Sequence, residues 1–341
     1  MTRILKYLLK ILLFFLLFLS TGCQPDLEFL PTPIPQEPPV EPTQASLLSL
    51  TQVTITHQVP SPTFPLKSPT ALIETPTPPT SNPANNFSAI LESPIPADFP
   101  QNVDASYLYG TTQNGLRIPH DGVEFYQPFG TPVLAAADGK VIFSGTDEIN
   151  AWGRFTNFYG NLVIVQHSNL GNAPFYSLYG HLSSLAVKNG DTVRQGDLVG
   201  AIGASGGAFG SHLHFEVRLG GNELKHTANP LLFLQLLTDK NGQETGILLG
   251  NIRDNKGALV PSANLVLQKV VEGRIILEES LYQETYSKDI PSHPEWQENF
   301  VFANLTPGEY RISTFINQVL YEQFISLQTG QFINIQLKAE D

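Results

Sequence analysis

The chain has 341 residues, of which 31 are acidic and 19 are lysine or arginine, so its formal net charge at pH 7 is −12. This acidity argues against a nucleic-acid partner, because proteins that bind nucleic acids present a basic surface. Cys23 is the one cysteine of the chain, which excludes an intrachain disulfide.

Residues 1–23 have the pattern of a secretory signal. Arg3 and Lys6 precede the apolar run YLLKILLFFLLFLS, and small residues then lead to Cys23. A cysteine directly after such a run resembles the lipidation site of a bacterial lipoprotein, where acyl chains on Cys23 anchor the protein to the membrane. The alternative is an uncleaved N-terminal anchor. Both interpretations predict a membrane-anchored protein whose remaining residues lie outside the cytoplasm.

Residues 24–100 are rich in proline, threonine and serine, and they contain 18 of the 27 prolines. A segment with so little apolar content cannot offset the entropy lost on ordering, so we expect a disordered, extended tether. At about 3.1 Å per residue its upper reach is roughly 240 Å. Such a tether suits a domain that works at a distance from the membrane.

Residues 101–238 consist of short β-branched runs separated by turn signals, which predicts an all-β sandwich or barrel. One short helix is expected after Pro230, in PLLFLQLL. Residues 245–341 repeat the β pattern without histidine clusters and predict a second, smaller sandwich. The fold class expected for the chain is therefore all-β.

The segment GSHLHFEVRL carries two histidines one residue apart. Because a strand has a period of two residues, His212 and His214 project to the same face while Leu213 points to the other. Two imidazoles on one face can converge on a metal ion. The alternative for this pattern alone is a pair of polar residues on a solvated strand face, as in a half-buried strand.

Two further segments add metal-binding side chains. His120 stands four residues before Glu124 in RIPHDGVEF, and His181 lies in the strand-like run YSLYGHL. His120, Glu124 and one histidine of the 212–214 pair make the three protein ligands of a catalytic zinc site with an open fourth position. Imidazole and carboxylate together favour zinc over magnesium or calcium, which prefer shells of oxygen atoms.

Three motifs in order resemble the lysostaphin and LytM-type zinc peptidases, which cut peptide cross-bridges of peptidoglycan. The family pattern H-x-G-x-D, Y-x-H-L and H-L-H-F-E corresponds to residues 120–124, 179–182 and 212–216, with Glu124 in place of the aspartate. The resemblance implies a LytM-type antiparallel β-sheet with a barrel-like sandwich over 101–238. It also implies zinc held by His120, Glu124 and His214.

The same resemblance implies that His181 and His212 flank the water that attacks the substrate. We interpret His212 as the general base and His181 as the partner of the oxyanion or of a transferred proton, and the two roles are exchangeable. The implied activity is zinc-dependent hydrolysis of cell-wall peptide cross-links by an enzyme anchored in the membrane and facing the wall.

Glu124 departs from the family pattern, which has Asp at that position. Glutamate binds zinc, but its extra methylene moves the carboxylate by about one bond length. Asp121 is acidic too, but in an extended segment it should face away. The departure keeps a second hypothesis open: a catalytically impaired LytM-type scaffold that binds cell wall or activates other wall hydrolases. A third is an exported protease without wall specificity.

Three features lie outside these motifs. The segment 146–161 is long for a hairpin connection, and its Trp152, Arg154, Phe155 and Phe158 are candidates to wall a peptide groove. His167 is interpreted as a core histidine or as one that orients a ligand. Residues 245–341 resemble transthyretin-like or carboxypeptidase-regulatory-like β-sandwich modules, which implies a role in spacing or binding.

Overall fold

The computed structural model describes residues 90–170 and 173–339, and all of them belong to one compact unit of the chain. The expected signal segment 1–23 and the expected tether up to residue 89 lie outside the described residues. Within the described ranges, no helix has the length and apolar character needed to cross a membrane.

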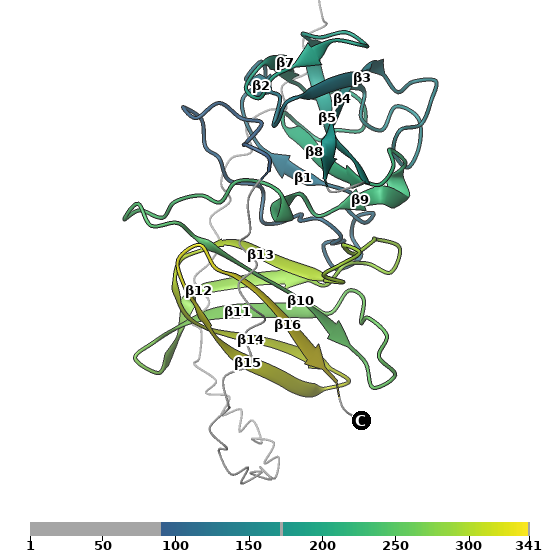
Figure 1. Cartoon of the computed structure of the whole chain (residues 1–341). Helices are drawn as coiled ribbons and strands as arrows, with labels where there is room; N and C mark the ends of the chain where they lie inside the picture. Colours follow the sequence, from purple (N-terminus) through teal and green to yellow (C-terminus); the bar gives the residue numbers. More distant parts are fainter. Residues whose placement is uncertain (1–89, 171–172, 340–341) are drawn as a thin grey trace, which may run out of the picture. The chain divides into compact units, whose positions relative to one another are not determined.

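Nine strands form the sheet of the first part of the described chain (Figure 1). They are β1 (Val123–Phe125), β2 (Pro132–Leu134), β3 (Gly139–Thr146), β4 (Asn161–Leu170), β5 (Ala173–Leu185), β6 (Thr192–Val193), β7 (Leu198–Ile202), β8 (Leu213–Leu219) and β9 (Thr227–Ala228). Two 3₁₀ helices, η1 (Leu224–His226) and η2 (Pro230–Leu232), are the only helical elements in the described ranges. The helix expected after Pro230 is therefore reduced to one 3₁₀ turn.

The sheet is antiparallel throughout, with the order β1-β8-β5-β4-β3-β6, while β7 joins β2 to β5 and β9 flanks β8. The all-β prediction is confirmed. Alternation along β4 explains how both sheet faces are covered: Val163 and Val165 enter the main core, whereas Leu162 and Ile164 enter a smaller apolar cluster. Around β4 the sheet is thus covered by apolar side chains on both faces.

Residues 90–100, at the end of the segment expected to be a tether, pack onto this sheet. Leu91 forms a parallel bridge with Leu234, and Leu91 and Ile95 are buried in the main core. Their apolar side chains fill space beside η2 that the sheet alone leaves open.

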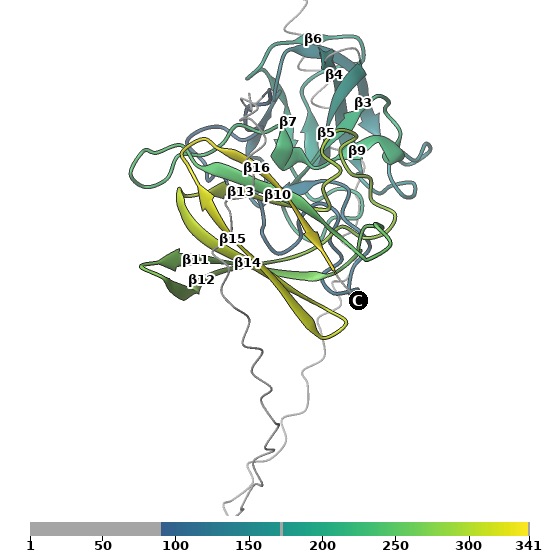
Figure 2. The same cartoon turned by 60° about the horizontal axis from the view of Figure 1, so that its bottom comes forward.

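The second part of the chain contains two further sheets. The strands are β10 (Gly246–Arg253), β11 (Asn264–Val271), β12 (Arg274–Glu284), β13 (Phe300–Leu305), β14 (Gly308–Ile316), β15 (Val319–Leu327) and β16 (Phe332–Lys338). The sheet β13-β10-β16 lies over the sheet β12-β11-β14-β15 (Figure 2). Apolar side chains from both sheets form one core between them, including Ile252, Leu267 and Ile312. Among these strands, β10 and β16 are parallel.

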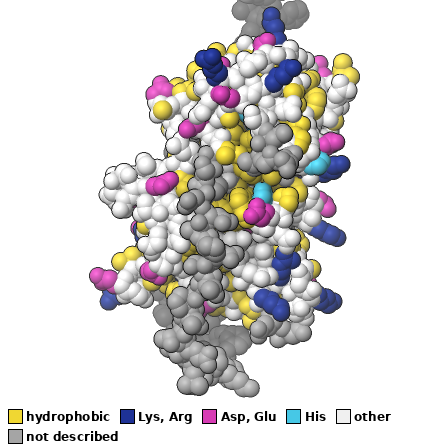
Figure 3. All heavy atoms as spheres, in the orientation of Figure 1, with side chains coloured by type: hydrophobic (Ala, Val, Ile, Leu, Met, Phe, Trp, Pro, Cys, Tyr) yellow, Lys and Arg dark blue, Asp and Glu magenta, His cyan; other side chains and the backbone are white. Residues whose placement is uncertain are grey.

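Charged side chains of both signs are scattered over the visible face of the molecule, with apolar side chains between them (Figure 3). No field of lysine and arginine dominates the part of that face that the described residues form. This distribution agrees with the low pI of about 5.1.

Candidate metal centre

Strand register places the first ligands side by side. Strands β1 and β8 are antiparallel, and Glu124 is directly opposite His214 in their ladder. Directly opposed residues have Cβ atoms only about 5 Å apart, so their side chains share one patch of the sheet face. On the other side of β8, Gly180 of β5 pairs with His214, which puts His181 one residue beyond. Three strands therefore bring Glu124, His214 and His181 together, while His120 shortly precedes β1 and His212 directly precedes β8.

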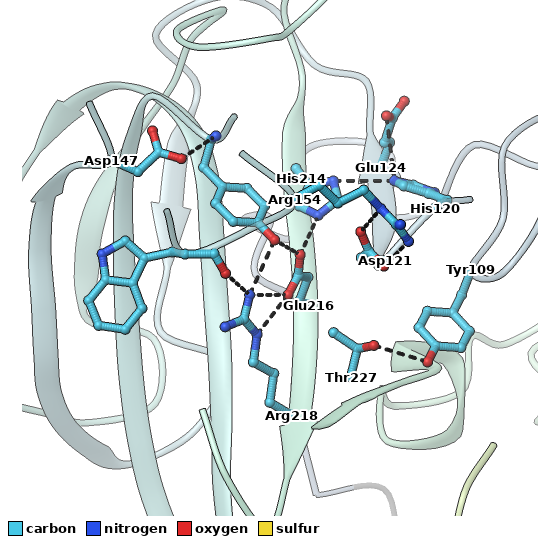
Figure 4. Close-up of polar contacts among 12 residues, drawn as sticks. Tyr109, His120, Asp121, Glu124, Asp147, Arg154, His214, Glu216, Arg218 and Thr227 are labelled. Atoms are coloured by element: carbon cyan, nitrogen blue, oxygen red, sulfur yellow. Dashed lines mark hydrogen bonds and ion pairs between the residues drawn. The ribbon is translucent and has the colours of Figure 1, made fainter. Parts of the chain in front are cut away.

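His120, Glu124 and His214 converge there (Figure 4). Nε2 of His120 lies 3.2 Å from Nδ1 of His214 and 3.6 Å from Oε1 of Glu124. One potential ligand atom from each of the three residues lies within 4.8 Å of the others, and all three side chains are buried. The separations match those of ligands that share one metal at about 2 Å each.

The protonation of the two imidazoles can be inferred from their other partners. Nδ1 of His120 lies 2.7 Å from the carbonyl oxygen of Tyr107, which accepts only, so that nitrogen carries the proton. Nε2 of His214 lies 3.0 Å from Oε1 of Glu216 and donates to that carboxylate. The two nitrogens that face each other across 3.2 Å therefore both present lone pairs. Such an arrangement is repulsive unless a cation lies against both.

One further buried acceptor, on Glu124, points to the same requirement, and a second lies nearby on His212. Oε2 of Glu124 and Nε2 of His212 have no hydrogen-bond partner among the described residues. A buried polar atom without a partner is costly, and a bound ion is one of the few ways to satisfy it. Burial, and next the neighbouring His214, hold the pKa of His120 well below its usual value, so the ring is neutral as a metal ligand must be. The two nitrogens and one carboxylate fit zinc.

His181 and His212 form a second pair beside this cluster. Their ring centroids are 4.8 Å apart, and Nε2 of His212 lies 3.6 Å from Oε1 of Glu124. Nδ1 of His181 donates to the carbonyl of Ser205 (2.9 Å), and Nδ1 of His212 to that of Gly210 (3.1 Å). Both rings therefore present a proton-accepting Nε2 in the neutral form. His181 has a left-handed backbone with φ of 61°, a strained conformation that is concentrated at functional sites.

Burial dominates the electrostatics of this pair. It lowers the pKa of His181 to about 3, helped by the nearby His214 and His212. It also lowers the pKa of His212, against the opposing effect of the Glu124 carboxylate. Both side chains are therefore neutral bases near pH 7 when no metal is bound.

Sequence reasoning missed the polar network behind His214. Glu216 and Arg218 are fully buried, although the strand was expected to be half-buried, and Nε of Arg218 donates to Oε2 of Glu216 (2.9 Å). The Tyr159 hydroxyl also donates to Glu216. Burial alone would raise the pKa of Glu216, but Arg218 and the bonds from His214 and Tyr159 lower it to about 2. The ionised carboxylate fixes the ring orientation of His214.

Asp121 does not join the ligands. Its carboxylate is buried and accepts from Nε and Nη2 of Arg154, each at 2.7 Å. Burial and the nearby Glu216 raise the pKa of Asp121 to about 6, against the lowering effect of Arg154. Arg154 is thus a structural partner of Asp121 rather than a wall of the cleft. His167 bonds to the Asp138 carbonyl (2.9 Å) and to the Ser177 hydroxyl (2.8 Å), away from the cluster.

The cluster lies in a cleft of about 280 Å³. Phe158, from the loop expected to wall a groove, lines it, whereas Trp152 packs on Phe143. Tyr107 and Arg117 line the cleft as well, and sequence reasoning missed both because the segment before His120 carries no motif. The remaining lining residues are Leu116, Ile118, Pro119, His120, Glu124, Tyr126, His181, Gly207, Ala208, Phe209, His212 and His214.

Comparison with known proteins gives a match to peptidase family M23 over residues 118–226. The cell division protein DipM of Caulobacter vibrioides is 36% identical over 120 residues, which are 35% of this chain and 17% of that protein. The peptidoglycan DD-endopeptidase ShyA of Vibrio cholerae is 36% identical over 120 residues, 35% of this chain and 24% of that protein. The chain therefore spans at most a quarter of the length of these two relatives.

Among solved structures, the catalytic domain of lysostaphin from Staphylococcus simulans is 28% identical. The similarity covers 37% of this chain and 88% of that domain, with a TM-score of 0.31. The family match confirms the resemblance to LytM-type peptidases that the three motifs indicate.

Proposed function

Because residues 118–226 are a domain of peptidase family M23, we propose that the protein is a zinc-dependent endopeptidase that hydrolyses peptide cross-links of bacterial peptidoglycan. The observation that carries the proposal is the pair of imidazole lone pairs facing each other at 3.2 Å beside a carboxylate. The name of the relative ShyA, a peptidoglycan DD-endopeptidase, supports the substrate class.

In this proposal His120, Glu124 and His214 hold the zinc. When bound there, zinc lowers the pKa of a water toward about 7 and polarises the scissile carbonyl. Glutamate at position 124 is compatible with this role, because its Oε1 already lies 3.6 Å from Nε2 of His120. The impaired-scaffold hypothesis rests on this residue, and the digestion assay described below tests it.

His212 serves as the general base in the proposed mechanism. Its Nε2 carries a lone pair, is buried and has no hydrogen-bond partner among the described residues, so it can take a proton from the attacking water. His181 lies beside it with the same tautomer and can take a proton in turn. Once protonated, Nε2 of His181 donates to the developing oxyanion or to the leaving amine.

Membrane attachment is a further part of the proposal, supported by the sequence alone. Cys23 follows the apolar run of a secretory signal, and lipidation there, or retention of the N-terminal anchor, would hold the enzyme outside the cytoplasm near the wall. Mass spectrometry of the N-terminus of the membrane-bound protein separates the two: acyl chains on Cys23 with residues 1–22 removed support lipidation, and an unmodified Cys23 within an intact N-terminal segment supports the apolar run as the anchor.

Digestion of purified peptidoglycan by the full chain tests the activity. We expect cross-linked dimers to disappear, a chelator to stop the reaction and added zinc to restore it. A scaffold would bind the wall material without releasing products at any zinc concentration. A general protease would cleave unrelated peptides as readily as the wall, so a panel of unrelated peptides provides the matched comparison.

A further inference from the structure

One cation lines the cleft that contains the candidate metal centre. Among the described residues that line it, Arg117 is the only lysine or arginine. The two arginines closest to the polar network have fixed partners, since Arg154 pairs with Asp121 and Arg218 with Glu216. Arg117 has no carboxylate within ion-pair distance in the described ranges.

Aromatic rings hold this guanidinium in place. Cζ of Arg117 lies 4.5 Å from the centroid of the Tyr107 ring and 6.0 Å from that of Phe209. The backbone N–H of Arg117 donates to the carbonyl of Thr112 (2.9 Å). Stacking on a ring uses the face of a guanidinium and leaves its edge, with up to five N–H donors, free for a planar anion.

Arg117 lies close to the candidate metal ligand His120, and therefore close to the peptide bond that would be hydrolysed. The Tyr107 ring is stacked on His120 with a centroid distance of 4.1 Å and an interplanar angle of 5°. Since Cζ of Arg117 is 4.5 Å from the same Tyr107 centroid, the guanidinium is less than 9 Å from the imidazole of His120. An extended peptide covers about 7 Å in two residues. A group bound by Arg117 therefore belongs to a residue within about two positions of the hydrolysed bond.

We propose that Arg117 is a specificity-determining residue that binds a free carboxylate of the substrate, next to the cleaved peptide bond. The proposal rests on the zinc endopeptidase function and deepens it by naming the substrate class. Arg117 would favour cross-links that contain an acidic diamino acid over uncharged glycine bridges. Arginine recognises carboxylates through two parallel hydrogen bonds.

A matched pair of cross-linked peptides tests the proposal, identical except that the carboxylate is free in one and amidated in the other. The full chain with zinc should hydrolyse the free acid with a kcat/KM about 10- to 100-fold higher, the effect of hydrogen bonds to a charged group. The variant Arg117→Gln should lose that preference, so that its kcat/KM values on the two peptides agree within about threefold. Arg117→Lys should keep part of it. Placing the carboxylate on the acyl or on the amine side of the bond identifies its source.

The variant Arg194→Gln is the control, since Arg194 is exposed and lies outside the cleft. Equal losses on both peptides in Arg117→Gln would overturn the proposal and reduce Arg117 to a support for Tyr107. Affinities of the two peptides for the zinc-free protein are measured in parallel. If the wild-type protein binds the free acid more tightly and Arg117→Gln abolishes that difference in affinity, the proposal for Arg117 is supported. This holds even if neither peptide is hydrolysed, an outcome that would contradict the endopeptidase function alone. Equal affinities overturn it.

Discussion

Replacing Glu216 by glutamine tests the buried network behind His214. Both side chains of the Glu216–Arg218 pair are fully buried, and Nη2 of Arg218 lies 2.8 Å from Oε2 of Glu216. Removing one partner of a buried ion pair costs about 3–5 kcal/mol, because the other charge remains without compensation. The carbonyls of Trp152 and Asn222 still accept from Arg218, so we expect the lower end, about 3 kcal/mol. For a unit of this size that lowers the Tm by about 6–12 °C.

The assay is denaturant unfolding of the full chain in chelator, which removes any contribution of zinc to stability. The double variant Glu216→Gln with Arg218→Met is the matched control. It removes the stranded charge as well, and we expect it to recover most of the lost free energy. A loss below about 1 kcal/mol in the single variant, or a double variant no more stable than the single one, would refute the reasoning.

Three other predictions concern separate parts of the molecule. A Cβ at Gly122 would lie 2.4 Å from the carbonyl oxygen of Phe215, so Gly122→Ala should lower the free energy of unfolding by about 1–3 kcal/mol, measured by denaturant titration. Burial raises the pKa of Glu298 to about 7, so the folded state keeps this proton to a higher pH than the unfolded chain. Stability should therefore fall as the pH rises from about 4.5 to 7, by about 3 kcal/mol, and Glu298→Gln should remove that part of the dependence. His212→Ala should lower kcat by about 10²- to 10⁴-fold while metal analysis finds the zinc retained, and loss of zinc would instead make His212 a ligand.

Sequence patterns could predict the face on which the histidines meet. The period of two in HLHFEVRL places residues 212, 214, 216 and 218 on one side of a strand, and the structure brings both histidines to the cleft. The same pattern places Glu216 and Arg218 on the face of the histidines, because all four alternate positions are polar. The expectation of a half-buried strand missed the network, because Glu216 and Arg218 are fully buried. The signal was an unbroken polar face opposite Leu213, Phe215 and Val217.

Other parts of the site depend on long-range register. That Glu124 is opposite His214 follows from the pairing of β1 with β8, which no local pattern specifies. The bond from His120 to the carbonyl of Tyr107 fixes a tautomer, yet it joins residues 13 positions apart through an irregular segment. Arg117 was overlooked for the same reason. Its environment is created by Tyr107 and Phe209, which are distant in sequence and come together only in the folded chain.

Metal analysis of the purified full chain tests the central claim most directly. Wild-type protein and the variant His214→Ala are measured together with His226→Ala, which alters a half-buried histidine bound to Glu223 outside the cleft. We predict one zinc per chain in the wild type and in His226→Ala, and none in His214→Ala. Folded wild-type protein without zinc, or stoichiometric zinc in His214→Ala, would contradict the account.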